Sequence, residues 1–336
     1  MAFEITNLNE DKGIDLITIF DQNSEIVLTN YGMRIVDWKV NGRSVVLGPD
    51  KNDNIVEYYR QNPYFFGATV GRYGGRIANG TFKLNDSTYE LERNEDPHHI
   101  HGGSNGLHTQ ICDYEVIDDG DVVTVTYQIT LKQEDDQYPG NIEGTVTHSY
   151  HLIDRKWTIS YEATSTEDTL FNPMNHVYFN LNETDTTIDN HVIQNENILM
   201  YNLDDDEIVR SKDNINLNEA IGKKIMSFKD IFESQLNQIS KFNGIDHPIL
   251  MENEKFTISN EDLEVTLETD RPFVVVFSLN EVEWNDTNQN IKTHGGFTLE
   301  AQSIPDDIHL YGDKAPSILR KGEPFKSVTS YTISNR

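Results

Sequence analysis

One acidic residue near the end of the chain is the strongest candidate for chemistry. Glu300 lies in residues 294–302, which read H-G-G-F-T-L-E-A-Q, and its near neighbours are apolar or small. A carboxylate in such a strand-like segment is either ion-paired or functional, because burying an unpaired charge is costly. Partial desolvation also raises the pKa of a carboxyl group toward neutrality, which suits a general base.

A second candidate is a histidine surrounded by amides and aromatic rings. His176 lies in residues 171–181, which read F-N-P-M-N-H-V-Y-F-N-L. Amides can bond the hydroxyl edges of a sugar, and aromatic rings can cover its apolar C–H faces. The alternative is a core histidine whose hydrogen bonds are satisfied, and this segment alone does not decide between the two.

Three histidines cluster in residues 98–103, H-H-I-H-G-G. Alternate side chains of a strand point to one face, so we expect His99 and His101 to lie together. Such a pair can bind a metal, but no cysteine and no second ligand-spaced pair is nearby. The sequence therefore disfavours a structural zinc site in this segment.

Two further segments combine glycine with charged side chains. Residues 71–77 read G-R-Y-G-G-R-I, and their arginines, Arg72 and Arg76, can donate to sugar hydroxyls or carboxylates. The alternative is a tight turn with solvated arginines. The glycine spacing does not match a phosphate-binding loop. Residues 244–248, G-I-D-H-P, add Asp246 on an expected turn.

Several common catalytic signatures are absent from the sequence. It contains no H-E-x-x-H helix and no G-x-G-x-x-G after a strand, and its G-x-S-x-G match at residues 102–106 lies in a glycine-rich turn rather than in a strand-to-helix elbow. A serine hydrolase, a zinc hydrolase and a dinucleotide-binding enzyme are therefore unsupported.

The composition limits the partners. Among 336 residues, 56 Asp and Glu oppose 27 Lys and Arg, for a formal net charge of −29. Such a chain repels phosphate backbones and anionic membranes, so we expect neither nucleic acid nor a membrane as a partner. The same charge disfavours a phosphorylated substrate, although a local basic pocket could override it.

The single cysteine and the N-terminus indicate a cytoplasmic protein. Cys112 cannot form an intrachain disulfide, and its place before a strand-like run predicts a buried thiol rather than a nucleophile. Residues 1–20 lack a basic region followed by an apolar stretch, so they do not resemble a signal peptide.

Short strands separated by turns dominate the rest of the pattern. Asn41-Gly42 predicts a tight hairpin turn, because both residues tolerate positive φ. Residues 118–121 and Asp154-Arg155 mark two more hairpins. The expected strands are residues 25–29, 34–40, 43–47, 114–117, 122–131, 144–152, 156–163, 256–259, 263–269 and 273–279.

Helical patterning is scarce. The best candidate covers residues 227–239, where Ser227 can cap the first turn and Asp230 follows three residues later. Apolar residues then recur near one helical face. Many strands with little helix predict an all-β fold, a large antiparallel β-sandwich with few short helices, formed by a single domain over residues 1–336.

In this order, the motifs resemble the galactose mutarotase (aldose 1-epimerase) family. The resemblance rests on residues 71–77, I-H-G-G at 100–103, N-P-M-N-H-V-Y-F-N-L at 172–181, residues 244–248 and G-G-F-T-L-E-A-Q at 295–302. Residues 28–38, L-T-N-Y-G-M-R-I-V-D-W, resemble the family's first hairpin. Each motif is weak singly, but five in order are specific and span nearly the whole chain.

The resemblance implies a β-supersandwich with an open sugar cleft and no metal or organic cofactor. It implies Glu300 as catalytic base, His176 as catalytic acid and His101 as a second active-site histidine near the ring oxygen. Asp246 and Arg76 match residues that bind sugar hydroxyls. The substrate would be a free hexose such as galactose or glucose, whose ring a carboxylate and an imidazolium can open and reclose. We expect a monomer or a homodimer.

The chain departs from the family pattern near the expected substrate. The family often has Ala-Asn where this chain has Gly74-Gly75, and an Asn shortly before the second motif where this chain has His98 and His99. These changes leave the preferred sugar open. They leave the acid and the base in place.

Three other functions stay open. An epimerase of hexose 6-phosphates could use Arg72, Arg76 and Arg93 on the phosphate. A non-catalytic sugar-binding module could keep the fold, but it would be expected to lack Glu300 or His176. A glycoside hydrolase would need two carboxylates at a defined separation.

Overall fold

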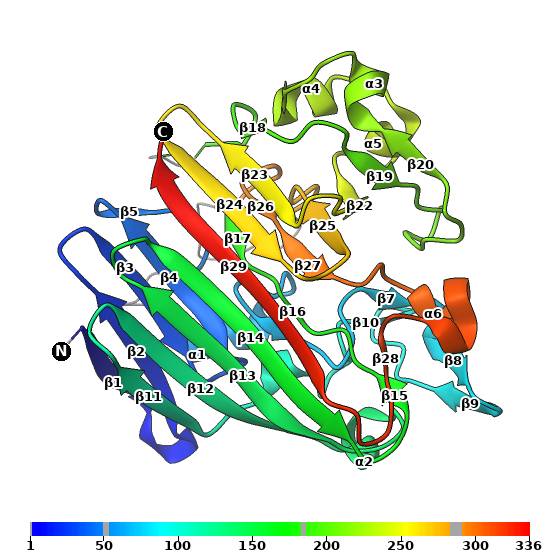
Figure 1. The fold of residues 1–336 in the computed structure, drawn as a ribbon, viewed down its shortest axis with the longest axis horizontal. Coiled ribbons are helices and arrows are strands. Elements are labelled where there is room, and N and C mark those ends of the chain that lie inside the picture. The colour runs from blue at the N-terminus through cyan, green and yellow to red at the C-terminus, as the bar shows by residue number, and fades with distance from the viewer. Residues whose placement is uncertain (1, 50–53, 183–185, 283–290) are drawn as a thin grey trace.

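Two antiparallel sheets packed against each other form the body of the protein. The computed structural model describes residues 2–49, 54–182, 186–282 and 291–336. In Figure 1 the smaller, blue sheet lies at the left, beside the long green and red strands of the larger sheet. The smaller sheet consists of β1 (Phe3–Asn9), β2 (Ile14–Phe20), β3 (Ser24–Thr29), β4 (Arg34–Val40) and β5 (Arg43–Ser44), in that order.

The larger sheet has nine strands, and β29 near the C-terminus lies at its centre. This placement joins two groups of strands that are distant in sequence. Its spatial order is β11 (Tyr114–Asp118), β12 (Val122–Leu131), β13 (Ile142–His151), β14 (Lys156–Ser165), β29 (Phe325–Asn335), β24 (Leu263–Thr269), β23 (Lys255–Ser259), β18 (Val192–Ile193) and β21 (Met226–Ser227).

Alternation along the strands explains why the sheets pack. In β12 every second side chain is buried, beginning with Val123, and the others face outward, as expected for a strand with one face in the core. Trp38 of the smaller sheet reaches the larger one, where its indole N–H donates to the Tyr150 hydroxyl at 3.1 Å and its ring packs edge-on against Trp157. A shared aromatic core therefore joins the sheets.

The predicted hairpins are confirmed with small changes in length. Asn41 and Gly42 have φ of 53° and 81°, and Val40 pairs with Arg43 across the turn. The strands expected over residues 122–131 and 263–269 are β12 and β24 with those bounds. The strand expected over 43–47 is shorter, because the chain leaves the sheet after Ser44, and Val46 bridges to Phe179 instead.

A third sheet and several short ladders lie on the right in Figure 1. The third sheet has the order β20 (Asn214–Asn216), β19 (Leu199–Tyr201), β22 (Asp246–Leu250), β25 (Phe273–Phe277) and β27 (Glu300–Gln302). The two-stranded ladders are β6 (Thr69–Val70) with β16 (Met174–Asn175), β7 (Arg76–Ile77) with β10 (His99–Ile100), β8 (Thr81–Leu84) with β9 (Ser87–Glu90), β15 (Thr169–Leu170) with β28 (Ile318–Leu319), and β17 (Tyr178–Phe179) with β26 (Phe297–Thr298).

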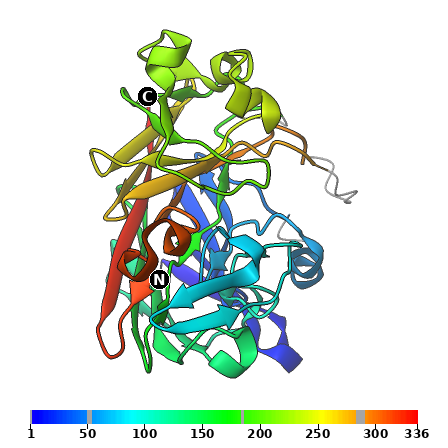
Figure 2. The ribbon, with the colours of Figure 1, turned by 90° about the vertical axis from the view of Figure 1, so that its right-hand side faces the viewer.

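The helices are short and peripheral. Figure 2 shows three of them, α3, α4 and α5, at one end of the molecule, with the cyan β8–β9 hairpin toward the other. Their bounds are α1 (Ile55–Gln61), α2 (Gln133–Asp136), α3 (Leu217–Ile221), α4 (Phe228–Phe232), α5 (Asn237–Lys241) and α6 (Asp307–Tyr311), with 3₁₀ turns at η1 (Glu10–Lys12), η2 (Ala78–Gly80), η3 (Leu107–Thr109) and η4 (Gly312–Lys314). These elements confirm the predicted all-β sandwich with few short helices.

The single helix predicted over residues 227–239 is wrong in its extent. Ser227 and Asp230 form the expected reciprocal capping box at the start of α4. The chain then leaves the helix after Phe232, and Gln235 adopts a φ of 59°, which an α-helix cannot accommodate. A second short helix, α5, begins after Leu236.

Two smaller features complete the fold. Cys112 is buried as predicted, and burial raises the pKa of its thiol to about 12, so it is not a thiolate nucleophile. Among the described residues, every helix falls short of the length and apolar character needed to cross a bilayer.

Candidate active site

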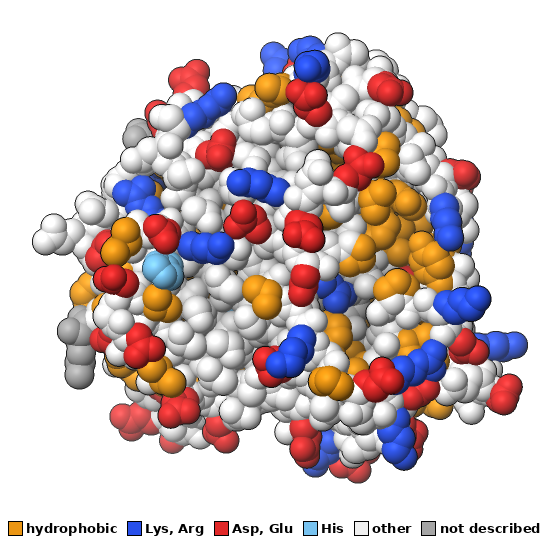
Figure 3. Space-filling model, in the orientation of Figure 1, with side chains coloured by type: hydrophobic (Ala, Val, Ile, Leu, Met, Phe, Trp, Pro, Cys, Tyr) orange, Lys and Arg blue, Asp and Glu red, His pale blue; other side chains and the backbone are white. Residues whose placement is uncertain are grey.

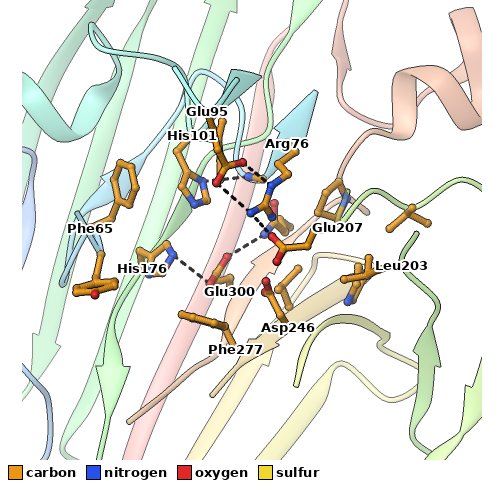
Figure 4. Close-up of a pocket in the computed structure, with 18 of the residues that line it drawn as sticks. Phe65, Arg76, Glu95, His101, His176, Leu203, Glu207, Asp246, Phe277 and Glu300 are labelled. Carbon is orange, nitrogen blue, oxygen red and sulfur yellow. Dashed lines mark hydrogen bonds and ion pairs between the residues drawn. The ribbon is translucent and has the colours of Figure 1, made fainter. Parts of the chain in front are cut away.

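A cleft of about 270 Å³ opens between the third sheet and the short ladders. Figure 3 shows hydrophobic side chains gathered on the right of the molecule, around a hollow on this face. The cleft contains the five residues to which the family resemblance assigns roles: Arg76, His101, His176, Asp246 and Glu300. Figure 4 shows their side chains converging from different elements.

Strand register places two carboxylates on one face of the third sheet. In β25, Phe277 pairs with Asp246 of β22 and Val275 pairs with Glu300 of β27. Directly paired residues of antiparallel strands share a face, as do residues two apart on one strand. Asp246 and Glu300 therefore both face the cleft, with Phe277 and Val275 between them as an apolar floor.

Glu300 is buried at the bottom of the cleft. Its carboxylate accepts hydrogen bonds from Thr298 Oγ1 at 2.8 Å and Gln302 Nε2 at 3.2 Å. Burial raises the pKa of Glu300 to about 8, and the nearby Asp246 acts in the same direction. This is the direction expected from the sequence for a general base that works near neutral pH.

His176 faces Glu300 from the connection between β16 and β17. Its Nε2 lies 3.4 Å from Glu300 Oε1, the contact drawn as a dashed line in Figure 4. Burial lowers the pKa of His176 to about 3. Burial therefore disfavours the imidazolium expected from the sequence, and the raised pKa of Glu300 favours protonation of the carboxyl group instead.

His101 approaches from the other side of His176. The two rings are perpendicular, with centroids 5.2 Å apart, and Phe65 packs edge-on against His101. The Gly75 amide donates to His101 Nδ1 at 3.1 Å, which fixes the tautomer with the proton on Nε2. Burial, together with the neighbouring His176, keeps the pKa of His101 well below its ordinary value. His101 is thus a neutral hydrogen-bond donor.

Asp246 and Arg76 form the polar rim of the cleft. Burial raises the pKa of Asp246 to about 7, although the nearby Arg76 opposes the shift. Arg76 makes a two-pronged ion pair with Glu95, through Nε at 2.5 Å and Nη2 at 3.0 Å, and Nη2 also contacts Glu207. The rim therefore carries more carboxylates than cations.

Comparison with known proteins identifies the family of the chain. The family model described as Aldose 1-epimerase matches residues 15–332. The chain belongs to the aldose 1-epimerase family. It is therefore an isomerase, and it interconverts the anomers of an aldose.

Individual relatives agree over most of the chain. A maltose epimerase of Levilactobacillus brevis is 27% identical, over 98% of this chain and 97% of its own length. The galactose mutarotase of Homo sapiens is 27% identical, over 90% of this chain and 87% of its own. A solved galactose 1-epimerase from Lactobacillus acidophilus superposes with a TM-score of 0.86 at 24% identity, covering 99% of this chain and 98% of that one, which establishes the common fold.

Two arginines of one family motif have different surroundings. Arg76 lies in the cleft, but Arg72 is completely buried away from it. Arg72 donates to both carboxylate oxygens of Asp136 at 2.9 Å, and to Pro139, Gly140 and Thr169. The alternative of solvated arginines is wrong for Arg72, whose role in this epimerase is structural.

The histidine cluster does not act as one unit. His99 packs against Tyr138 and contacts the Glu92 carbonyl through Nδ1, whereas His101 lines the cleft. The expectation that both point to one face is wrong, because the chain leaves the extended conformation at His101, where φ is 53°. Within the described ranges, no three His, Cys, Asp or Glu side chains are placed to hold a metal.

Several cleft residues had no signal in the sequence. Phe65, Glu95, Glu207 and Phe277 all line the site. Glu95 and Glu207 lie in polar segments, where an acidic residue is ordinarily solvated. A local pattern cannot reveal that both side chains contact the guanidinium of Arg76, because only the tertiary fold brings these three residues together.

Proposed function

We propose that Glu300 and His176 exchange protons with a free aldose bound in this cleft. Glu300 takes the proton of the C1 hydroxyl, and His176 gives a proton to the ring oxygen. The 3.4 Å approach of His176 Nε2 to Glu300 Oε1 carries this assignment, because it joins one acid and one base inside a buried site. Positioned acid–base groups each contribute about 10²–10⁴-fold.

The reaction follows from the movement of these two protons. Loss of the O1 proton and protonation of the ring oxygen break the C1–O5 bond and give the open-chain aldehyde. Rotation about C1–C2 presents the other carbonyl face, and the reverse transfers close the ring. The pair carries a single proton, so its titration belongs to both groups, and the productive form has that proton on His176.

The neutral imidazole of His101 supports ring opening without a second proton transfer. Its Nδ1 is engaged by the Gly75 amide, so Nε2–H is available to donate to the ring oxygen as charge develops there. Asp246 and Arg76 are proposed to bind hydroxyl groups. Val275 and Phe277 lie between the carboxylates as an apolar surface for the C–H face of the sugar.

The proposed substrates are free hexoses such as galactose and glucose. The names of the relatives support this class, since one is a galactose mutarotase. The maltose epimerase relative, which spans 98% of this chain, supports a second candidate, the reducing-end glucose of a disaccharide. A hexose 6-phosphate has less support, because Arg72 is buried and Arg76 is already paired with carboxylates.

Polarimetry of freshly dissolved α-D-galactose, α-D-glucose and maltose tests the proposal. We expect the protein to accelerate the approach to anomeric equilibrium for at least one of them. Absence of acceleration over buffer for every free aldose would contradict the proposed substrate class.

We further infer a cytoplasmic location, supported by the single, buried cysteine.

A further inference from the structure

Arg76 is the only Lys or Arg among the described residues that line the cleft. A lone guanidinium at a cleft rim is ordinarily an anion-binding site, because its fork of N–H donors matches a carboxylate or a phosphate. Here two carboxylates of the chain already occupy that fork. Glu95 takes Nε and Nη2, and Glu207 contacts Nη2. Nη1 makes no hydrogen bond with any described residue and is left to donate to a neutral hydroxyl.

The second of these carboxylates comes from a braced loop between β19 and β20. The side chain of Asp204 accepts from the backbone amides of Asp206 and Ile208, and from Arg210 Nε at 2.7 Å. This turn holds Glu207 at a φ of 60°. Figure 4 shows the Glu207 side chain directed at Arg76, beside Asp246.

The same loop is tied to the strand that carries Asp246. Gln238 bonds both the amide and the carbonyl of Leu203, at 2.9 and 3.1 Å. Its Oε1 also lies 2.9 Å from His247 Nε2. His247 Nδ1 accepts from the Asp246 amide, so Nε2 carries the donated proton. A chain of direct contacts therefore fixes the position of Glu207 relative to the cleft floor.

The charges of the cleft favour neutral ligands. One guanidinium faces four carboxyl groups: Glu95, Glu207, Asp246 and Glu300. The Glu207 side chain is about one-third exposed, so its effect on an incoming charge is partly screened by solvent and salt.

We propose that Glu207 is a specificity-determining residue that excludes anionic sugars by occupying Arg76. It leaves the guanidinium one free edge for a neutral hydroxyl and removes the positive charge that would attract a uronate or a sugar phosphate. This inference rests on the proposed function, since it concerns the same cleft and the same reaction.

The test compares kcat/KM for D-glucuronate and D-glucose, measured by NMR exchange between the anomeric protons. In Glu207→Gln we expect the glucuronate-to-glucose ratio to rise by on the order of tenfold over wild type, the effect of one unit charge several ångström away at an intermediate dielectric. In wild type the ratio should also rise as salt increases from about 20 mM to about 500 mM. The ratio of kcat/KM for a hexose 6-phosphate to that for glucose should change in the same direction as the glucuronate ratio.

Asp205→Asn is the matched control, because it removes the same charge from the same loop. Asp205 is almost fully exposed and pairs with Lys241 rather than with Arg76. An equal rise in Asp205→Asn would show a general charge effect and overturn the role of Glu207. Glu95→Gln provides an independent route if Glu207→Gln does not fold, and it too should raise the ratio.

The outcomes separate the two proposals. If wild type accelerates glucose and neither Glu→Gln variant changes the ratio, the specificity inference is wrong and the proposed function stands. If wild type accelerates no free aldose, the proposed function itself fails.

Discussion

Two buried pairs of a basic and an acidic side chain in this protein differ in how fully their hydrogen bonds are satisfied. In the structural pair, Nε and Nη2 of Arg72 donate to the two carboxylate oxygens of Asp136. Its Nη1 donates to two backbone carbonyls and a threonine hydroxyl. In the cleft pair, His176 and Glu300 approach only to 3.4 Å, and the buried Nδ1 of His176 has no partner among the described residues.

The difference distinguishes a pair suited to holding the fold from a pair suited to acid–base chemistry. A fully satisfied buried pair has no donor or acceptor left for a ligand, and breaking it leaves an uncompensated charge. A partly satisfied pair has shifted pKa values and spare hydrogen-bonding capacity, both of which a substrate can use. Substitutions in the cleft pair should therefore lower activity more than stability, and substitutions in the structural pair should lower stability more than activity.

The largest expected effect is on activity at Glu300. Glu300→Gln keeps the size of the side chain but removes the base, so kcat should fall by about 10³–10⁴-fold. Sugar binding should remain detectable by calorimetry, because the rim residues are unchanged. Turnover near that of wild type would contradict the assignment of Glu300.

The next effect is on stability at Arg72. Arg72→Ala leaves Asp136 buried without its partner, so the free energy of unfolding should fall by about 3–5 kcal/mol. Chemical denaturation measures this loss. Arg93→Ala is the control, because Arg93 is exposed and bonds only the Asn79 carbonyl among the described residues, and it should change stability by less than about 0.5 kcal/mol. Similar losses in both variants would contradict a structural role specific to Arg72.

His176→Asn should lower kcat by about 10²–10³-fold through loss of the acid. His148→Asn is the matched control, because His148 is also buried and burial also lowers its pKa to about 3. It packs between Tyr127 and Trp157 in the sandwich core. We expect that variant to lose stability but to keep kcat per folded molecule. Equal losses of kcat would remove the distinction between the two histidines.

The stability of Glu300→Gln should depend on pH. The folded pKa of Glu300, about 8, lies above its ordinary value, so ionisation opposes folding. Its contribution to stability is fully present below the unfolded pKa and is lost as pH rises through about 8. The glutamine variant avoids this loss, so its melting temperature should exceed that of wild type by a few °C at pH 8–9 and by less at pH 5. A constant difference across that range would contradict the raised pKa.

The sequence predicts the sandwich better than the cleft, because hairpin signals are local. Asn41-Gly42 alone specifies a turn between adjacent strands, and the structure has it. The cleft needs Asp246 and Glu300 to meet across β25, which depends on register between strands distant in sequence. The sequence singles out Glu300 and Asp246 in separate segments, and only the family resemblance implies that they belong to one site.

Local patterns also fail where the backbone leaves its regular conformation. Apolar spacing over residues 227–239 continues past Gln235, whose positive φ breaks the helix. In the same way, His101 leaves the strand that was expected to align it with His99. No sequence pattern marks Glu207, since its contact with Arg76 depends on the loop between β19 and β20 that Asp204 braces.

The smallest effect is expected at the rim, where Asp246→Asn should act on binding. Burial raises the pKa of Asp246 to about 7, so wild type binds sugar with an ionised Asp246 only above that pH. Loss of one hydrogen bond from a charged acceptor costs about 1.5 kcal/mol, or roughly a tenfold rise in KM. Below pH 6, Asp246 is protonated in wild type, and the two KM values should converge. A KM unaffected by the substitution at pH 8 would mean that Asp246 does not bind the sugar, and a difference independent of pH would mean that it binds without titrating.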